Sequence, residues 1–406
     1  MDLTYGSEME AFRLEVRGFL EANWPPSAPK QDAEKLSRED QTWQFRERAI
    51  AEGYLCRAIP KQYGGSEQPV DALRGQVIRE EFGAARAPME PRGIGTMMLV
   101  PTLLDRGEEW QKEKFVGPTI RGEITWCQGY SEPGSGSDLA SLMTKAEIDG
   151  DDWVINGQKI WTSGAQHADY MFCLVRTEPD AKKHAGISYL LIDMKSSGID
   201  VRPLRQMTGS SEFSEVFFND VRTPADWIVG KRGEGWLVSR TTLKHERNSI
   251  GGAAQTVSLL NALVDLAKSR KLDGRPAIED PGVRRELIEI EGYIRSHQYS
   301  GFLQMTRGLK GENAGVIALM NKLISTNIGH KVTRLAMELL GDDGLLAPHD
   351  RGLGLSAEGT STAGWISQSM ASLGIAIAGG TANIQRNVIA ERGLGLPRDA
   401  AANRSR

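Results

Sequence analysis

The spacing of apolar residues changes twice along this 406-residue chain, and these two changes constrain the fold more than any other feature. Up to about residue 122 the spacing is helical, since apolar side chains recur on one helical face. The first such face is formed by Phe12, Val16, Phe19 and Leu20. From about residue 123 to 231 the period falls to two, which is typical of strands, and from Gly233 the helical period returns. Strands that are grouped, instead of alternating with helices, exclude a doubly wound parallel sheet.

We therefore expect an α+β protein of several domains. The predicted ranges are 1–122 for an N-terminal helical domain, 123–231 for a middle β-domain, 232–396 for a C-terminal helical domain and 397–406 for a tail. In the middle domain, Asn156-Gly157 suits the positive φ angles of a type I′ turn, so a hairpin is predicted there. Further strands are expected over Tyr170–Arg176, Gly186–Met194, Ile199–Leu204 and Glu215–Phe218.

Composition and charge remove several classes of function. Hydrophobic residues make up 40% of the chain and charged residues 25%, and no run approaches the roughly 20 apolar residues of a membrane span. The N-terminus lacks the basic and apolar regions of a secretion signal, so we expect a cytoplasmic protein. A net charge of −4 without a basic tract argues against nucleic acid as a partner.

Several familiar cofactor and metal motifs are incomplete or missing. The three cysteines lie far apart and form no CxxC pair, which argues against a disulfide framework and against structural zinc. His245-Glu246 begins the zinc motif HExxH, but residue 249 is Ser, and no metal site is predicted. No segment completes the dinucleotide fingerprint GxGxxG, and the P-loop and GxSxG motifs are absent.

The segment QGYSEPGSGSD, residues 128–138, carries the most chemistry. Its glycines, proline and hydroxyl groups predict a tight polar loop. Successive backbone N–H groups of such a loop converge on an anion, and Ser131 and Ser137 add hydroxyl donors. An ordinary surface loop has the same composition, so the residues alone leave both interpretations open.

The second polar segment, NGQKIWTS, covers residues 156–163 and places Trp161 at the end of the predicted hairpin strand. One interpretation makes Trp161 a core residue. The other makes it an aromatic side chain packed on a planar cofactor, with Ser163 hydrogen-bonded to the polar edge of that cofactor.

Four groups of motifs resemble, in order and spacing, those of the acyl-CoA dehydrogenases. They read SEPGSGSD (131–138), NGQKIWTS (156–163), NDVRTPADWIVG (219–230) with GEGW (233–236), and GGTANIQRNVIAERGLGLPR (379–398). The resemblance is closest to the bacterial branch that acts on unusual acyl-CoAs, such as pimeloyl-CoA or steroid side-chain thioesters. It implies a helical N-terminal domain, a middle β-barrel domain and a C-terminal four-helix bundle.

The resemblance also implies FAD, held between the middle and C-terminal domains and completed by a neighbouring subunit. Ser131 and Ser163 match positions that hydrogen-bond the isoalloxazine ring, and Trp161 matches the position that packs against it. Ser137 matches a position near the pyrophosphate, and Gln128 begins the same cofactor loop.

Further cofactor residues are implied in the C-terminal domain. Arg270 matches an arginine given to the FAD phosphates of the adjacent subunit. Glu338 and Gly341, in ELLGDDG, stand where the family often has QxxGGxG, a loop at the ribityl and adenosine parts. Thr381 and Asn383 match a turn near the adenine.

This chain departs from that family pattern by carrying acids near the cofactor phosphates. Glu338 replaces the usual glutamine, and Asp342-Asp343 replace neutral residues. We expect these acids to point away from the cofactor, or the cofactor to take a different pose.

The catalytic base is predicted by a second departure. Much of the family carries the base as Glu in a YEGT motif, but the matching residue here is Gly379, which cannot abstract a proton. Another branch places the base in a Glu-Arg pair on the long helix that opens the last domain. The matching pair is Glu246, the predicted base, and Arg247, predicted to support the substrate wall, although a solvated helix pair has the same sequence.

The resulting functional prediction is α,β-dehydrogenation of an acyl-CoA thioester, with electrons passed to an electron-transfer flavoprotein. A homotetramer or a heterotetramer with a related chain is expected. Two alternatives remain: a flavin monooxygenase or oxidase on the same fold, and a non-catalytic subunit of a heteromeric enzyme. The acyl group is not specified; Tyr130 is a predicted substrate contact, and Met89, Met97 and Met98 are candidates for the pocket wall.

Overall fold

A computed structural model describes most of the chain. The described residues are 5–24, 37–250, 253–313, 315–346, 348 and 361–397, with the backbone alone for 246–250 and 253–255. The chain divides into two units, Met1–Trp126 and Cys127–Arg406, and each is considered by itself. Within the described ranges, no helix is both long and apolar enough to cross a membrane.

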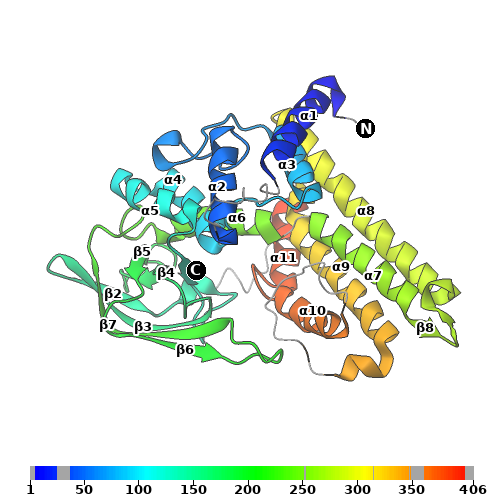
Figure 1. The fold of residues 1–406 in the computed structure, drawn as a ribbon. Helices are drawn as coiled ribbons and strands as arrows, with labels where there is room; N and C mark the ends of the chain where they lie inside the picture. The colour runs from blue at the N-terminus through cyan, green and yellow to red at the C-terminus, as the bar shows by residue number, and fades with distance from the viewer. Residues whose placement is uncertain are drawn as a thin grey trace. The chain divides into compact units, whose positions relative to one another are not determined.

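The first unit is helical, as predicted (Figure 1). Its α-helices are α1 Gly6–Asn23, α2 Arg38–Ala51, α3 Ala72–Ala84, α4 Val100–Arg106 and α5 Glu109–Arg121. The apolar face predicted for the first helix is buried in α1 at Phe12, Val16 and Leu20, where it packs in one cluster with α2 and α3. Glu81 of α3 is almost fully buried and pairs with Arg13 of α1 at 2.5 Å, so its carboxylate has a charged partner where α1 and α3 meet.

The second unit begins with a seven-stranded mixed sheet that curls into a half-barrel. Its strands are β1 Trp126–Gly129, β2 Lys145–Asp149, β3 Asp152–Ser163, β4 Tyr170–Arg176, β5 Ile187–Asp193, β6 Ile199–Leu204 and β7 Phe213–Pro224. The hydrogen-bonded order is β1-β4-β2-β3-β7-β6, and β5 pairs with β4. The predicted strands over Tyr170–Arg176 and Ile199–Leu204 are confirmed as β4 and β6.

The hairpin turn predicted at Asn156-Gly157 is wrong. The turn lies earlier, at Gly150-Asp151, where Asp149 of β2 faces Asp152 of β3. Asn156 and Gly157 instead lie inside β3 at an irregularity of its pairing with β7. The Asn156 side chain is held there by Asp220, and a Cβ on Gly157 would come within 2.7 Å of the Thr144 Cα. The positive φ of Gly157 therefore belongs to a β-bulge, where the strand passes close to Thr144, and not to a turn.

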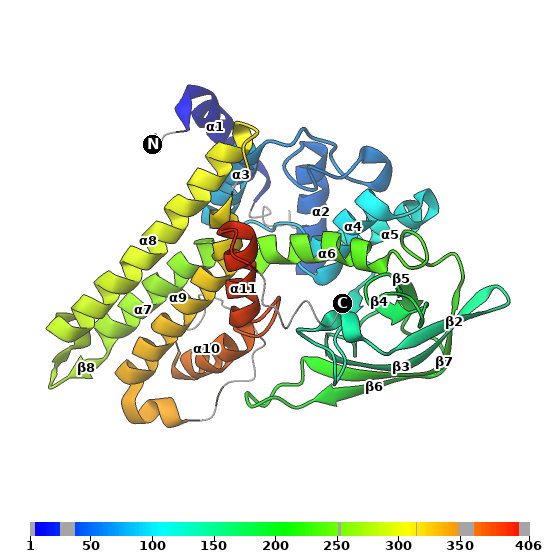
Figure 2. The same cartoon turned by 180° about the vertical axis from the view of Figure 1, so that it is seen from behind.

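The remainder of the second unit is helical, and its long helices run beside one another (Figure 2). Its α-helices are α6 Gly235–Ile250, α7 Ala253–Ser269, α8 Pro281–Leu309, α9 Val316–Leu340, α10 Thr362–Ile375 and α11 Ala382–Val388. Helices α7 to α10 share one hydrophobic core, with the Trp365 side chain fully buried in it. The two short strands β8 Lys271–Leu272 and β9 Arg275–Pro276 form a small hairpin after α7.

Candidate active site

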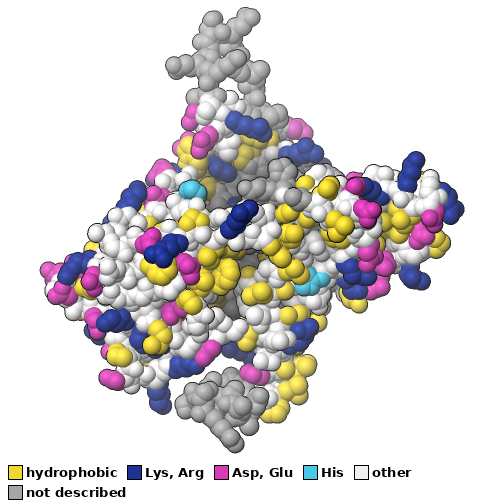
Figure 3. Space-filling view, turned by 90° about the horizontal axis from the view of Figure 1, so that it is seen from below, with side chains coloured by type: hydrophobic (Ala, Val, Ile, Leu, Met, Phe, Trp, Pro, Cys, Tyr) yellow, Lys and Arg dark blue, Asp and Glu magenta, His cyan; other side chains and the backbone are white. Residues whose placement is uncertain are grey.

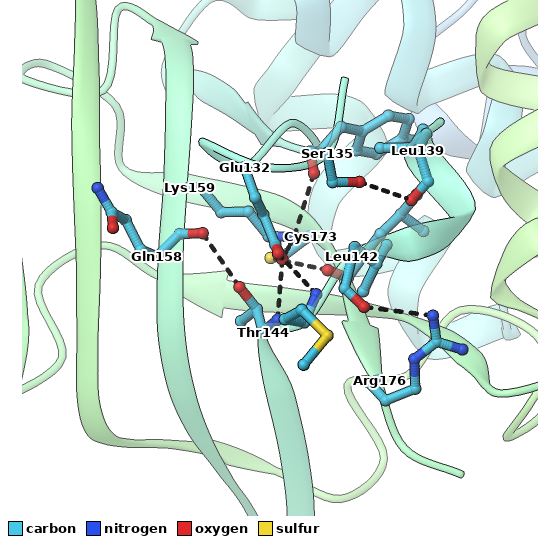
Figure 4. Close-up of polar contacts among 12 residues, drawn as sticks. Glu132, Ser135, Leu139, Leu142, Thr144, Gln158, Lys159, Cys173 and Arg176 are labelled. Carbon is cyan, nitrogen blue, oxygen red and sulfur yellow. Dashed lines mark hydrogen bonds and ion pairs between the residues drawn. The ribbon is translucent and has the colours of Figure 1, made fainter. Parts of the chain in front are cut away.

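A buried ion pair joins the predicted cofactor loop to strand β3. The Lys159 ammonium, fully buried, donates to Glu132 Oε1 at 2.8 Å and to the Tyr130 carbonyl at 3.1 Å. The next residue, Ile160, donates its backbone N–H to the Ser131 carbonyl at 2.9 Å. Figure 4 shows Lys159 and Glu132 facing each other beneath the loop. These bonds fix the loop around Ser131 against the strand that carries Trp161.

Glu132 is held ionised in this pair. Burial alone would raise the pKa of the Glu132 carboxyl, but the Lys159 charge and hydrogen bonds from the neighbouring backbone hold it below its usual value. Two of those bonds come from the N–H groups of Met143 and Thr144, at 2.6 and 2.9 Å. A buried charge that is paired and fully hydrogen-bonded is tolerated in a protein interior.

The second half of the loop is fixed by two cations. Arg176, at the end of β4, donates to the Ala140 and Leu142 carbonyls at 2.7 and 3.2 Å (Figure 4). Lys183 pairs with Asp138 at 2.6 Å. The loop and the residues that follow it are therefore held by β3, by the end of β4 and by the turn after β4.

Trp161 stands out from the sheet in an uncommon conformation. The pairing of β3 with β7 is interrupted between Lys159 and Thr162, and Trp161 has a φ of 60°. A left-handed non-glycine residue is costly and occurs mainly at turns, bulges and functional sites. The indole is 59% exposed and touches the Phe213 ring edge-on. The interpretation of Trp161 as a core residue is therefore wrong, and most of its surface is accessible to a ligand.

The residues present fit a flavin of the kind predicted. Ser163 is exposed two residues beyond Trp161, and Ser131 is partly exposed on the loop hydrogen-bonded to β3. A Cβ at Gly134 or Gly136 would meet nothing of this chain within 4 Å, so chain packing does not explain these glycines. Glycines with open space beside them suit the close approach of a phosphate to the backbone. Ser137 is exposed on this open side, and Gln128 lies partly buried in β1.

Arg270 and the turn after α9 come together in the helical part. The Arg270 guanidinium pairs with Asp343 at 2.5 Å and donates to Thr362 Oγ1 at 2.8 Å. Asp343 lies in the 3₁₀ turn η5 Gly341–Leu345. Of the three acids expected to point away from the cofactor, or else to accompany a different cofactor pose, Asp343 bonds the Arg270 guanidinium directly.

Other predicted residues of the helical part lie at helix ends. Glu338, near the end of α9, is exposed and pairs with Arg334 one turn earlier, at 3.0 Å. Thr381 caps α11 by accepting the Ile384 N–H, and Asn383 is exposed on that helix. The structure thus places the predicted cofactor residues in three groups: the β-sheet loop, the Arg270 turn and the start of α11.

Helix α6, which carries the predicted base, is seated directly on β5. A Cβ on Gly235 would come within 2.3 Å of the Ser188 carbonyl carbon, so only glycine allows this approach. Gly233 also donates its N–H to Ser188 Oγ at 2.9 Å. The close approach to Ser188 explains Gly235, and a φ of 81° with the Ala185 carbonyl oxygen 2.8 Å from where a Cβ would lie explains Gly233. Glu246 and Arg247 lie in α6, but their side chains fall outside the described part of the structure, as do the paired glycines at 251 and 252.

Comparison with known families accounts for this arrangement. The N-terminal, middle and C-terminal domain models of acyl-CoA dehydrogenase match residues 6–123, 127–221 and 233–394. The chain belongs to the acyl-CoA dehydrogenase family. Members of this family are oxidoreductases that use FAD.

Relatives and solved structures of the family cover nearly the whole chain. Acyl-CoA dehydrogenase IpdE1 of Mycobacterium tuberculosis is 38% identical over 402 residues, which are 97% of this chain and 99% of that protein. The ChsE4-ChsE5 complex of the same organism matches with a TM-score of 0.75 at 29% identity, over 98% of this chain and 100% of the matched one. A structure described as the Tcur3481-Tcur3483 steroid ACAD matches with a TM-score of 0.76 at 28% identity, over the same shares.

Sequence reasoning missed the residues that support this site. Lys159 and Glu132 lie within the two motifs, yet a charged residue in a motif gives no sign that its partner is buried beneath a loop. Arg176 ends a predicted strand and reads as an ordinary boundary residue. The one available signal was Lys159, a lysine at a position that the strand alternation predicts to be buried. Placing a turn at Asn156-Gly157 divided this strand, so the alternation could not be followed to Lys159.

Proposed function

We propose that this chain, with FAD bound, catalyses the α,β-dehydrogenation of an acyl-CoA thioester to the trans-2-enoyl-CoA. One observation carries the proposal. Hydrogen bonds from Lys159 and Ile160 hold the loop at Ser131 against β3, the strand that also carries Trp161 and Ser163. This arrangement offers an exposed aromatic face and hydroxyl groups side by side, which is what a flavin ring requires. Family membership supplies the class of reaction.

In this proposal the cofactor is held mainly by the β-sheet group. Trp161 covers one face of the isoalloxazine, Ser131 and Ser163 hydrogen-bond its polar edge, and Ser137 approaches the pyrophosphate. Gln128 supports the base of the same loop. When bound, FAD supplies the acceptor for the hydride that leaves Cβ of the substrate.

The remaining cofactor contacts are proposed to come from the helical part of a neighbouring subunit. Arg270 and the turn at Glu338 and Gly341 are assigned to the phosphate and ribityl parts, and Thr381 and Asn383 to the adenine end. Because Asp343 engages Arg270, the charge that this subunit offers to a phosphate is reduced. Binding of FAD is therefore proposed to depend more on the β-sheet group than on Arg270.

Glu246 is proposed as the base that takes the α-proton. The α-hydrogen of a thioester is only weakly acidic, so its removal needs a carboxylate held within hydrogen-bond reach in a site that excludes water. Arg247 is proposed to form part of the substrate wall. Tyr130 was predicted to contact the substrate, but only 5% of its surface is exposed, so we propose that it acts from beneath the site.

The substrate and partners are proposed from the relatives. A steroid-derived acyl-CoA is the proposed substrate, since one matched structure is described as a steroid ACAD. An electron-transfer flavoprotein is the proposed acceptor. A tetramer, formed with a second copy or with a related chain as in the matched ChsE4-ChsE5 complex, is the proposed assembly. The cytoplasm is the proposed location.

Anaerobic flavin reduction tests the reaction and the base together. Steroid, straight-chain, branched and dicarboxylic acyl-CoAs are mixed with the FAD-loaded protein, and bleaching of the flavin is followed. We expect Glu246→Gln to retain FAD and acyl-CoA binding while reduction slows by orders of magnitude. Glu291→Gln, an exposed change on α8, is the matched control and should reduce normally.

Three results would contradict the proposal. Reduction of Glu246→Gln at the wild-type rate would remove this base. Oxygen consumption without an added acceptor would favour an oxidase or monooxygenase. FAD binding without bleaching by any thioester would favour a non-catalytic subunit.

A further inference from the structure

A line of buried side chains leads from the cofactor loop to helix α6. Tyr130, directly before Ser131, is 5% exposed, and Tyr189 of β5 and Thr242 of α6 are fully buried. The Thr242 hydroxyl lies 3.4 Å from the Tyr189 hydroxyl and 3.3 Å from the Val238 carbonyl of its own helix, and its one proton is shared between these two acceptors. The Tyr130 ring meets the Tyr189 ring edge-on at 6.3 Å between centroids.

Tyr189 lies where these elements meet. Its ring stacks on Phe172 of β4, 5.9 Å away with an angle of 3° between the planes. Burial raises the pKa of the Tyr189 phenol, and its contact with the Thr242 hydroxyl counters this in part. The phenol therefore stays protonated and keeps a donor as well as an acceptor at neutral pH.

Packing alone does not account for these hydroxyls. Phenylalanine and valine have nearly the same shapes as tyrosine and threonine, and they bury no polar group. A hydrogen bond between buried hydroxyls is directional, so it fixes the position of one element along the other more closely than apolar packing does.

The contact fixes α6 at a second point along β5. The first turn of α6 is fixed on Ser188 through Gly233 and Gly235, and Tyr189, the next residue of β5, holds Thr242 two turns later. Position 246 follows Thr242 by four residues, about 6 Å along the helix axis and on the same helical face.

We propose that Tyr189 is a positioning residue, whose hydroxyl sets the place of α6, and hence of Glu246, relative to the cofactor loop. This inference rests on the proposed function for the role of Glu246. The anchor itself stands on the Tyr189–Thr242 contact and on the edge-on packing of the Tyr130 ring against Tyr189.

Tyr189→Phe and Thr242→Val test the anchor from its two sides. Each change removes the hydroxyl contact and keeps the shape. We expect the limiting rate of flavin reduction by a saturating acyl-CoA to fall about 10-fold to 100-fold, since small misplacements of a reacting group have effects of this size. The dissociation constants of FAD and of the acyl-CoA should change less than 2-fold. The double variant should be slower by less than the product of the two single effects, because both changes remove the shared Tyr189–Thr242 contact.

A second measurement does not depend on activity. Hydrogen exchange of the free protein should show faster exchange in α6 for both variants and unchanged exchange in α8. Tyr299→Phe, at a partly exposed tyrosine of α8, is the matched control and should alter neither quantity.

Different results overturn the anchor and the proposed base. The anchor fails when both variants leave α6 exchange and the reduction rate unchanged, when the two effects simply add, or when FAD affinity falls in place of the rate. The base fails when Glu246→Gln reduces the flavin normally, whatever Tyr189→Phe does.

Discussion

Trp161 holds a backbone conformation that suits glycine better than tryptophan. Its φ of 60° places a side chain in the left-handed region, at a cost of roughly 1–2 kcal/mol. We expect Trp161→Gly to be more stable than Trp161→Ala by about 1 kcal/mol, because glycine relieves this strain and alanine does not. Thermal and urea unfolding of the two variants provide the measurement.

Both Trp161 variants should lose FAD more readily than the wild type, since one face of the ring is uncovered. Equilibrium dialysis measures the loss. Met207→Ala, an equally exposed change in the same part of the chain, should retain FAD. If the Trp161 variants also kept the wild-type affinity, the packing role would be excluded.

The Lys159–Glu132 pair is expected to dominate the stability of the cofactor loop. Lys159→Met leaves a buried carboxylate without its cation, so we expect unfolding to become easier by about 3–5 kcal/mol. Lys159→Met combined with Glu132→Gln should be milder, because no charge then stays unpaired. Glu147→Gln, which breaks the exposed pair of Lys145 and Glu147, should change stability by less than about 1 kcal/mol.

The same pair gives a pH dependence with a defined sign. The pKa of Glu132 is lower in the folded protein than in the unfolded chain. Its contribution is therefore fully present above the ordinary glutamate pKa of about 4.3 and is lost as the pH falls through the lowered folded value. Wild type should lose more stability than Lys159→Met/Glu132→Gln over this acidic range, and equal slopes of stability against pH would contradict the assignment.

At the scale of the element, the seat of α6 on β5 depends on one missing side chain. Gly235→Ala would place its Cβ within 2.3 Å of the Ser188 backbone, so α6 must shift. We expect a loss of unfolding free energy of about 1–3 kcal/mol and a slower flavin reduction. Gly292→Ala in α8, where a Cβ meets nothing within 4 Å, should be neutral or stabilising by up to about 1 kcal/mol. Equal effects of the two changes would show that α6 is not tightly seated.

The sequence predicted most elements because their causes are local. The apolar stripe of α1 and the alternation of β4 follow from residues within each element. The exception is instructive: Asn156-Gly157 has the local chemistry of a turn, but Asp220 and Thr144, distant in the chain, hold it in a strand. The local residues determine which φ angles the backbone can adopt. Contacts with residues far along the chain determine whether those angles occur in a turn or in a strand.

At the scale of the whole molecule, the helical part exposes several large apolar side chains, which are candidates for a contact with another subunit. Those with more than half of their surface exposed include Leu345, Leu346, Leu373, Ile377, Leu394 and Leu396. On the face shown in Figure 3, positive and negative side chains are interspersed and hydrophobic ones also reach the surface. Neither sign gathers in one tract on that face, which favours apolar contacts over charge as a means of association.

We therefore expect a tetramer in solution, alone or with a related chain. Leu345→Glu with Ile377→Glu should shift light scattering towards smaller species, because both replaced side chains are exposed in the helical part. Leu14→Glu on α1, equally exposed, is the control and should not do so. A stable wild-type monomer that is replete with FAD would contradict this expectation.

By itself the sequence determined the order of helical and β regions and the family, and it indicated the loop that we propose holds the cofactor. These follow from periodicity and from motifs, which are properties of neighbouring residues. The tertiary structure decided how the loop is held by the Lys159–Glu132 pair, that Trp161 takes a left-handed conformation, and that Tyr189 contacts α6. It also paired Arg270 with Asp343, residues 73 positions apart. Such contacts depend on burial and on distances across the chain, which no spacing of residues specifies.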